Sequence, residues 1–158
     1  METATLEFRQ ISSTLCDSLT KLFASFETAG LAEFFHPHPF TPEYAKELSE
    51  YSGKDLYFLL LNDGQAIGYG MLRGWDEGYE VPSLGIAIHP EYQGLKLSRA
   101  LMEFLHCAAR LRGAPEVMLK VYNDNAPAVH LYQSMGYDMS ALNDKELRGR
   151  LALTKSAS

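Results

Sequence analysis

The spacing of apolar residues changes its period several times along the chain, and each change marks a new element. Apolar and polar residues alternate over residues 5–11, which predicts a short first strand. Leucine and phenylalanine then recur at helical spacing, which predicts a helix that is capped by Ser12 or Ser13 and ends near residue 28.

A short helix and three strands are predicted in the middle of the chain. The helix covers residues 42–51 and follows a loop rich in proline and histidine. The strands cover residues 55–62, 65–75 and 80–89. The first strand connection, Asp63-Gly64, is a strong hairpin signal and the second carries two glycines, so we expect the three strands to pair antiparallel.

The last part of the chain predicts a long amphipathic helix and further α/β alternation. The helix runs from about residue 97 to Gly113. The elements after it are a strand over 116–122, a helix over 126–135 and two strands over 137–143 and 150–155. This order predicts an α/β fold, an α+β mixed sheet flanked by helices, in which the unit around residues 90–116 is a parallel, right-handed crossover.

Composition narrows the class of protein. A chain of 158 residues with no internal repeat or linker predicts a single domain over residues 1–158. A net charge of −6 without a run of basic residues argues against nucleic acid or an anionic membrane as the partner. The N-terminus lacks the pattern of a signal peptide, and the two cysteines, Cys16 and Cys107, are expected to be reduced core residues. These features predict a cytoplasmic protein.

The stretch HPEYQGLKLSRALM, residues 89–102, reads as the end of a strand, a tight turn and the start of a helix. A helix N-terminus has unpaired N–H groups and partial positive charge, so such a turn can bind phosphate if the backbone comes close to it. Gly94 permits that approach, Lys96 adds a cation and Ser98 adds a hydroxyl. By spacing alone, an ordinary connection is the more common outcome.

Two motifs in the chain resemble those of the GNAT N-acetyltransferase superfamily. Residues 93–98 follow the family's turn pattern Gln/Arg-x-x-Gly-x-Gly/Ala at Gln93, whereas Lys96 and Ser98 replace its two glycines. Residues 125–137 match Asn-x-x-Ala-x-x-Leu-Tyr-x-x-x-Gly-Phe/Tyr at every defined position. The resemblance covers residues 56–137 well and implies the GNAT acyl-CoA fold.

The resemblance also implies that the chain binds acetyl-CoA as cosubstrate. The turn would hold the pyrophosphate through its amides, and the strand before it would pair with the pantetheine arm. The cofactor-binding residues implied are Ile86, Ala87, Ile88, Gln93, Gly94, Leu95, Lys96, Leu97, Ser98, Asn125 and Tyr132.

Acetyl transfer to an amine needs donors for the oxyanion and a proton for the departing thiolate. Tyr132 occupies the position of the family's general acid, and a pKa near 10 keeps a tyrosine protonated at neutral pH. A core aromatic residue is the alternative interpretation. The general base is assigned to Glu80, on the same strand face as Pro82, where the family often has a carboxylate. Ser83 or a water chain is the alternative, and so is an exposed Glu80 with no role.

The acceptor pocket is expected between the loop that joins the first two helices and the turn before residue 80. The candidate substrate-binding residues are His36, His38, Arg73, Trp75 and Tyr79. Aromatic, acidic and basic groups together suit a small polar amine such as an amino sugar, a polyamine or an amino-acid derivative. Two histidines without a third ligand are more often packing or pocket residues, so we expect no metal.

Two functions therefore remain open from the sequence. The favoured one is an acetyl-CoA-dependent N-acetyltransferase that acts on a primary amine of a small molecule by direct attack. The alternative is a non-catalytic acyl-CoA-binding or protein-interaction module on the same fold, which the altered turn and Pro82 suggest. The resemblance also allows a homodimer, although no residue predicts one.

Overall fold

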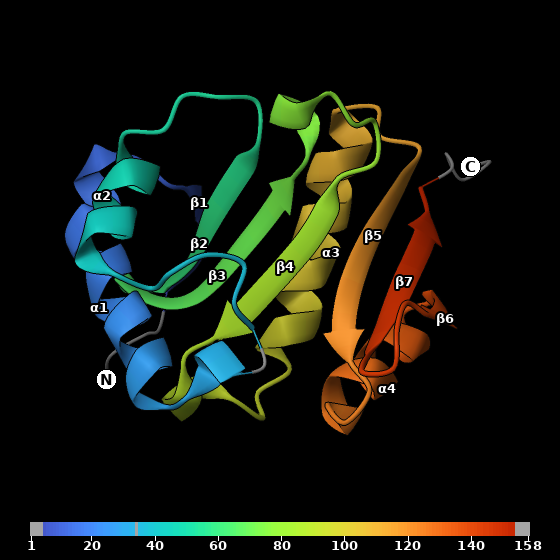
Figure 1. The fold of residues 1–158 in the computed structure, drawn as a ribbon. Helices are drawn as coiled ribbons and strands as arrows, with labels where there is room; N and C mark the ends of the chain where they lie inside the picture. Colours follow the sequence, from blue (N-terminus) through green and yellow to red (C-terminus); the bar gives the residue numbers. More distant parts are fainter. Residues whose placement is uncertain (1–4, 34, 154–158) are drawn as a thin grey trace.

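The computed structural model describes residues 5–33 and 35–153, which form a seven-stranded sheet with helices on both faces (Figure 1). The strands are β1 (Leu6–Gln10), β2 (Leu56–Asn62), β3 (Gln65–Arg73), β4 (Ser83–Ile88), β5 (Glu116–Tyr122), β6 (Asp138–Ala141) and β7 (Glu146–Ala152). The α-helices are α1 (Cys16–Thr28), α2 (Pro42–Ser49), α3 (Leu97–Leu111) and α4 (Ala126–Ser134), and short 3-10 turns precede or follow several of them. None of these helices is long and apolar enough to cross a membrane.

The sheet consists of two antiparallel parts that meet at one parallel pair of strands. Its order is β1-β2-β3-β4-β5-β7-β6, and only β4 and β5 run parallel. Their register contains a single residue pair, Ser83 with Met118, and the Met118 N–H also donates to the Pro82 carbonyl at 3.0 Å. Beyond this point the two strands diverge towards their C-terminal ends (Figure 1). The predicted parallel crossover is confirmed, and the divergence leaves a gap in the ladder of the sheet.

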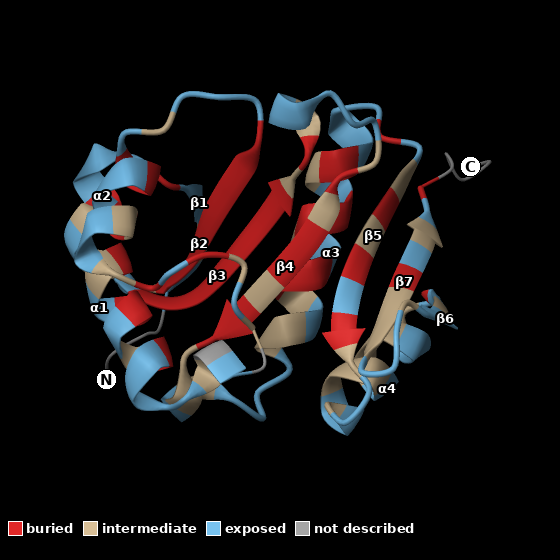
Figure 2. Ribbon diagram, viewed as in Figure 1, coloured by how far each residue is buried: buried red, intermediate tan, exposed pale blue. Residues whose placement is uncertain are grey.

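Each face of the sheet carries its own hydrophobic core. Residues of α1 and α2 pack on one face with Tyr69, Met71 and Ala87. Residues of α3 pack on the other face with Leu84, Ile88 and alternate residues of β5. Figure 2 shows that burial concentrates in the central strands and on the helix faces turned towards them. Successive side chains of β4 point to opposite faces of the sheet, so Ala87 belongs to one core and Leu84 and Ile88 belong to the other.

The element order and the type of every predicted element are confirmed, but several bounds are wrong. The strand predicted over 80–89 begins at Ser83, because Pro82 has no N–H with which to continue the ladder. The strand predicted over 65–75 ends at Arg73, before a 3-10 turn that contains Trp75. The capping prediction at the first helix is also wrong, since Ser12 makes no side-chain capping bond and α1 begins at Cys16 after a 3-10 turn.

The final strand differs most from its prediction. It was expected over residues 150–155, and β7 in fact spans Glu146–Ala152, while residues 154–155 lie outside the described part of the chain. Polar residues occupy much of β7 because one of its faces is open, so its alternation is masked in the sequence. Both cysteines are free, but the prediction that they are core residues is wrong, because Cys107 is exposed and Cys16 is only half-buried.

Candidate active site

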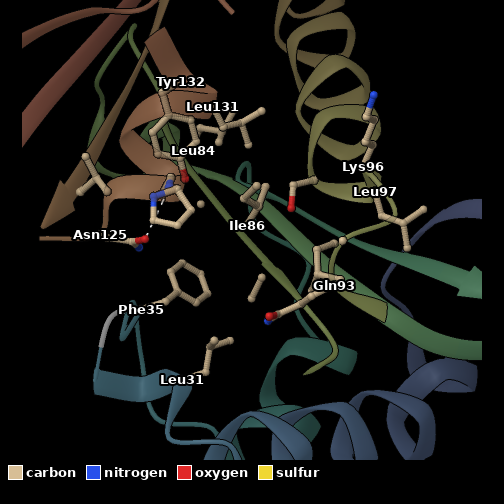
Figure 3. A pocket seen from close by; sticks show the side chains of 18 of the residues that line it. Leu31, Phe35, Leu84, Ile86, Gln93, Lys96, Leu97, Asn125, Leu131 and Tyr132 are labelled. Carbon is tan, nitrogen blue, oxygen red and sulfur yellow. Dashed lines mark hydrogen bonds between the residues drawn. The ribbon is translucent and has the colours of Figure 1, made fainter. Parts of the chain in front are cut away.

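A cavity of about 620 Å³ lies where β4 and β5 diverge. Its walls come from β4, from the turn before α3, from the end of β5 and from α4 (Figure 3). Leu31 and Phe35, from the connection between α1 and α2, line it on the side opposite Tyr132 (Figure 3). The sequence motifs that are distant along the chain therefore meet in one place.

Ten of the eleven predicted cofactor-binding residues line this cavity. They are Ile86, Ala87, Ile88, Gln93, Gly94, Lys96, Leu97, Ser98, Asn125 and Tyr132. Leu95 does not line the cavity, because its side chain is 64% exposed at the outside of the turn.

The turn before α3 has the backbone of an anion-binding turn despite its missing glycines. Gly94 adopts a φ of 85° and Lys96 a φ of 62°, so both lie in the left-handed region. Lys96 is the N-cap of α3, and the first amides of a helix have no partners within it. The Lys96 side chain extends along α3, away from the cavity (Figure 3). The side chain that replaces a family glycine therefore leaves the amides next to the cavity accessible.

Tyr132 and Asn125 are positioned by α4 and by the strand before it. The Tyr132 hydroxyl points into the cavity (Figure 3), and burial raises the pKa of this phenol to about 12. The ring of Tyr132 packs against Tyr137, with ring centroids 5.9 Å apart. Asn125 caps α4, since its Oδ1 accepts the Ala128 N–H at 3.4 Å. Tyr132 can thus hold a proton at the cavity at any pH near neutral.

None of the five predicted acceptor residues lines this cavity, so their role in acceptor binding stays a prediction. His38 is buried in the core beneath α1 and α2, where its Nε2 lies 2.7 Å from the Tyr69 hydroxyl. Burial lowers the pKa of His38 to about 4. His36 lies outside the cavity and pairs with the Tyr122 hydroxyl at 3.1 Å, which ties its loop to β5.

The other three acceptor candidates also have structural partners or lie at the surface. The Arg73 guanidinium donates to the Pro37 carbonyl at 3.0 Å. The Trp75 ring makes a cation–π contact with Arg112, whose guanidinium carbon lies 4.9 Å from the ring centroid. Tyr79 is 62% exposed, away from the cavity.

Glu80 lies outside both β4 and the cavity, so the strand argument that assigned it as the general base fails. It is exposed and belongs to the connection between β3 and β4. Asp55 holds the start of this connection, since its Oδ1 accepts the N–H groups of Gly74 at 3.0 Å and Trp75 at 2.9 Å. Alternation along a strand says nothing about a residue before the strand begins.

Several residues that line the cavity were not predicted from the sequence. They are Leu31, Leu84, Gly85, Tyr92, Lys120, Val121, Asp124, Pro127, Ala128 and Leu131. Leu84 lies on the strand, and Pro127, Ala128 and Leu131 on the helix, that carry predicted residues. No sequence pattern predicts that Lys120 lines the cavity, because β5 borders the cavity as a result of its divergence from β4. Within residues 5–33 and 35–153, no group of three or more His, Cys, Asp or Glu could hold a metal ion.

The model of the acetyltransferase (GNAT) family matches residues 18–137, which include every element that forms the cavity. The chain belongs to the GNAT family. Solved GNAT structures share its fold over almost the whole chain. The ribosomal-protein-S18-alanine N-acetyltransferase of Escherichia coli superposes with a TM-score of 0.73 at 20% identity, covering 97% of both chains. PaiA N-acetyltransferase from Thermoplasma acidophilum, in complex with coenzyme A, gives a TM-score of 0.77 at 16% identity, covering 94% of this chain and 99% of that one.

The names of curated relatives of this GNAT chain specify different acceptors. Streptothricin acetyltransferase of Streptomyces lavendulae is 32% identical over 89 residues, which are 55% of this chain and 46% of that protein. [Ribosomal protein bS18]-alanine N-acetyltransferase of Escherichia coli K12 is 28% identical over 123 residues, which are 75% of this chain and 82% of that protein. The chain spans about half the length of the first of these relatives.

Proposed function

We propose that the protein transfers the acetyl group of acetyl-CoA to a primary amine. The observation that carries the proposal is the cavity itself, which brings the amides before α3, the free edge of β4 and the Tyr132 hydroxyl together. Membership of the GNAT family and a relative solved with coenzyme A support this use of the cavity.

The residues of the cavity fit an acyl-CoA. The amides of the first turn of α3 would hold the diphosphate, because they are unpaired within the helix and carry its partial positive charge. Gly94 has no heavy atom within 4 Å of the position of a Cβ, so the turn is open on that side. Where β4 leaves β5, its backbone is available to an extended group that adds to the strand edge.

Tyr132 would act as the general acid. The amine nitrogen forms a bond to the thioester carbonyl carbon, the carbon–sulfur bond breaks, and the sulfur leaves with the proton of the Tyr132 hydroxyl. The nitrogen loses one proton as it becomes an amide, and this proton passes through water to solvent or to the Tyr132 phenolate, which is thereby restored to the phenol. A phenol pKa of about 12 keeps Tyr132 protonated near neutral pH, so its proton is available to the departing sulfur. The amine must be neutral to attack, so we expect the rate to rise with pH as the acceptor loses its proton.

The acceptor is proposed only as a primary amine of a small polar molecule or of a protein N-terminus. The sequence favours a small acceptor, such as an amino sugar, a polyamine or an amino-acid derivative. The name of the bS18 relative, which includes an alanine of a ribosomal protein, supports the protein N-terminus as an alternative.

The substitution Tyr132→Phe tests the proposal. We expect turnover to fall by about one to three orders of magnitude because the thiolate loses its proton donor, while affinity for acetyl-CoA changes little. Release of CoA thiol from a panel of amines measures turnover, and calorimetry measures binding. Tyr137→Phe is the matched control, since it removes a neighbouring buried hydroxyl, bonded to His106 at 2.7 Å, that does not line the cavity.

The alternative function, a non-catalytic acyl-CoA-binding or interaction module, makes a different prediction. Such a module releases no CoA with any amine, even where acetyl-CoA binds. Equal turnover of the wild type and Tyr132→Phe would remove Tyr132 from the mechanism. An absence of acetyl-CoA binding by calorimetry would contradict both functions.

A further inference from the structure

One face of β5 and β7 is open beside the cavity. Val117, Leu119 and Val121 belong to the core on the α3 side, so alternation places Lys120 on the opposite face of β5. Figure 1 shows that α1 and α2 lie over the other end of the sheet and do not cover this face of β5 and β7. Lys120 is exposed there and also lines the cavity. The open face and the cavity are therefore continuous at Lys120.

Two cations are directly opposite each other on this face. Lys120 of β5 pairs in register with Arg148 of β7, and directly opposed residues of an antiparallel pair project on the same face. Like charges at such positions destabilise a sheet. Neither residue takes part in a salt bridge within the described part of the chain, and the Arg148 Nε is buried without a hydrogen-bond partner there. An anion between the two side chains would remove the repulsion.

Two carboxylates of the same face are engaged elsewhere. Glu116 forms a salt bridge with Arg150, with 3.6 Å between its Oε1 and the arginine Nε. Glu146, diagonal to Lys120, accepts the side-chain amide of Asn143 at 3.2 Å. Asp138 of β6 pairs in register with Arg150, so neither Lys120 nor Arg148 has a carboxylate directly opposite it in the sheet.

We propose that Lys120 and Arg148 bind a carboxylate of the acceptor, so that the substrate is a primary amine that also carries an acidic group. This inference rests on the proposed function. A guanidinium and an ammonium on one face suit a carboxylate, to which each donates charge-assisted hydrogen bonds. Because Lys120 lies on the cavity wall, the carboxylate stays at the open face while the amine enters towards Tyr132. The acid group can belong to a free amino acid or to a peptide.

Matched acceptors that differ only in charge test this inference. One arm compares single amino acids with their amides, and the other compares N-terminally free, C-terminally amidated tripeptides containing Glu with those containing Gln. With the wild type, we expect the acidic member of at least one arm to have a kcat/KM about tenfold or more above that of its neutral partner. The arm with the larger ratio identifies the source of the carboxylate.

Variants locate the effect on the two cations. Lys120→Gln and Arg148→Gln should each bring the ratio towards one, and Lys120→Glu should reverse the preference. Arg148 does not line the cavity, so Arg148→Gln should also leave the affinity for acetyl-CoA unchanged by calorimetry. Lys46→Gln, which removes an exposed lysine of α2, is the matched control and should leave the ratio unchanged. A wild-type kcat/KM ratio near one in both arms overturns the inference. Variants that lose affinity for acetyl-CoA but keep the preference for the acidic acceptor overturn it too. Neither outcome contradicts the proposed acetyltransferase activity.

A second measurement does not depend on turnover. Titration of the isotopically labelled protein, saturated with CoA, with glutarate should give saturable amide shifts in β5 and β7 that Lys120→Gln removes. Shifts elsewhere, or none, contradict the inference. If no amine releases CoA but glutarate binds at this face, the proposed catalysis fails and the carboxylate site stands.

Discussion

Burial keeps two chemically different side chains neutral in this protein. It raises the pKa of the Tyr132 phenol to about 12, and it lowers the pKa of the His38 imidazole to about 4. In both cases the interior disfavours the charged form. Tyr132 holds its proton at the cavity wall, where a leaving group can take it. His38 is held in the core by Tyr69 and by stacking on Tyr44, so it is a structural residue.

The stability of the protein should therefore fall in mild acid. The pKa of His38 in the fold lies below the value of about 6.5 in the unfolded chain, so the unfolded chain binds more protons between these values. The free energy of unfolding is then expected to decrease as the pH drops from about 6.5 to about 4, by about 3 kcal/mol in total. Burial lowers the pKa of His106 as well, which adds to the loss in the same direction.

Urea unfolding at several pH values between 7 and 4.5 measures this loss. His38→Gln should flatten the dependence on pH, whereas His130→Gln, at an exposed position of α4, should leave it unchanged. A wild-type protein whose stability is constant over this range would show that the protonated His38 is tolerated in the core.

These residues also show what the sequence can and cannot predict about a site. Tyr132 could be placed because it belongs to a motif of fixed spacing on one helix, and that helix carries it to the cavity. His36 and His38 are two residues apart in one loop, yet one is exposed and the other is core. Their environments depend on which distant strand the loop covers, and no local pattern contains that information.

At the scale of elements, the turn before α3 combines a required glycine with an unusual lysine. Both Gly94 and Lys96 have positive φ, and a non-glycine residue there costs about 1–2 kcal/mol. We expect Gly94→Ala to lower the free energy of unfolding by about 1 kcal/mol and to weaken binding of acetyl-CoA. Lys96→Gly should raise the free energy of unfolding by up to about 1 kcal/mol, since it relieves the same strain.

Urea unfolding and calorimetry with acetyl-CoA measure the two effects on this turn. The Lys96 side chain extends away from the cavity, so Lys96→Gly is expected to keep most of the affinity (Figure 3). A large loss of affinity in Lys96→Gly, with none in Gly94→Ala, would mean that the lysine charge binds the diphosphate and the amides do not.

Element boundaries mark the limit of prediction by periodicity. The strand over Glu116–Tyr122 was predicted to the residue, because it is a run of residues that favour strands. The bounds of β4 and β7 were not, since a proline truncates the first and an open face makes the second polar. The error at β4 had a functional consequence, because it placed Glu80 on a strand that it does not reach.

At the scale of the whole molecule, the sheet is two antiparallel units that share little direct pairing. The strands β1–β4 form one unit, and β5, β7 and β6 form the other. Within the sheet, the two units are joined by the pair of Ser83 with Met118 and by the hydrogen bond from the Met118 N–H to the Pro82 carbonyl. The helix α3 packs against strands of both units. The gap that weakens the junction is the same gap that forms the cavity.

A ligand in this cavity should therefore stabilise the junction more than the rest of the fold. Segments with few ladder bonds open at lower free energy than central strands, and a ligand that binds only the closed form raises that energy. We expect acetyl-CoA to slow amide hydrogen exchange most in β4, β5 and the first turn of α3, and least in β1 and β2. Exchange measured by mass spectrometry with and without acetyl-CoA provides the comparison, and Gly94→Ala should reduce the difference at equal ligand concentration. Equal protection of all strands would mean that the two units open together and that the junction is not the weak point of the sheet.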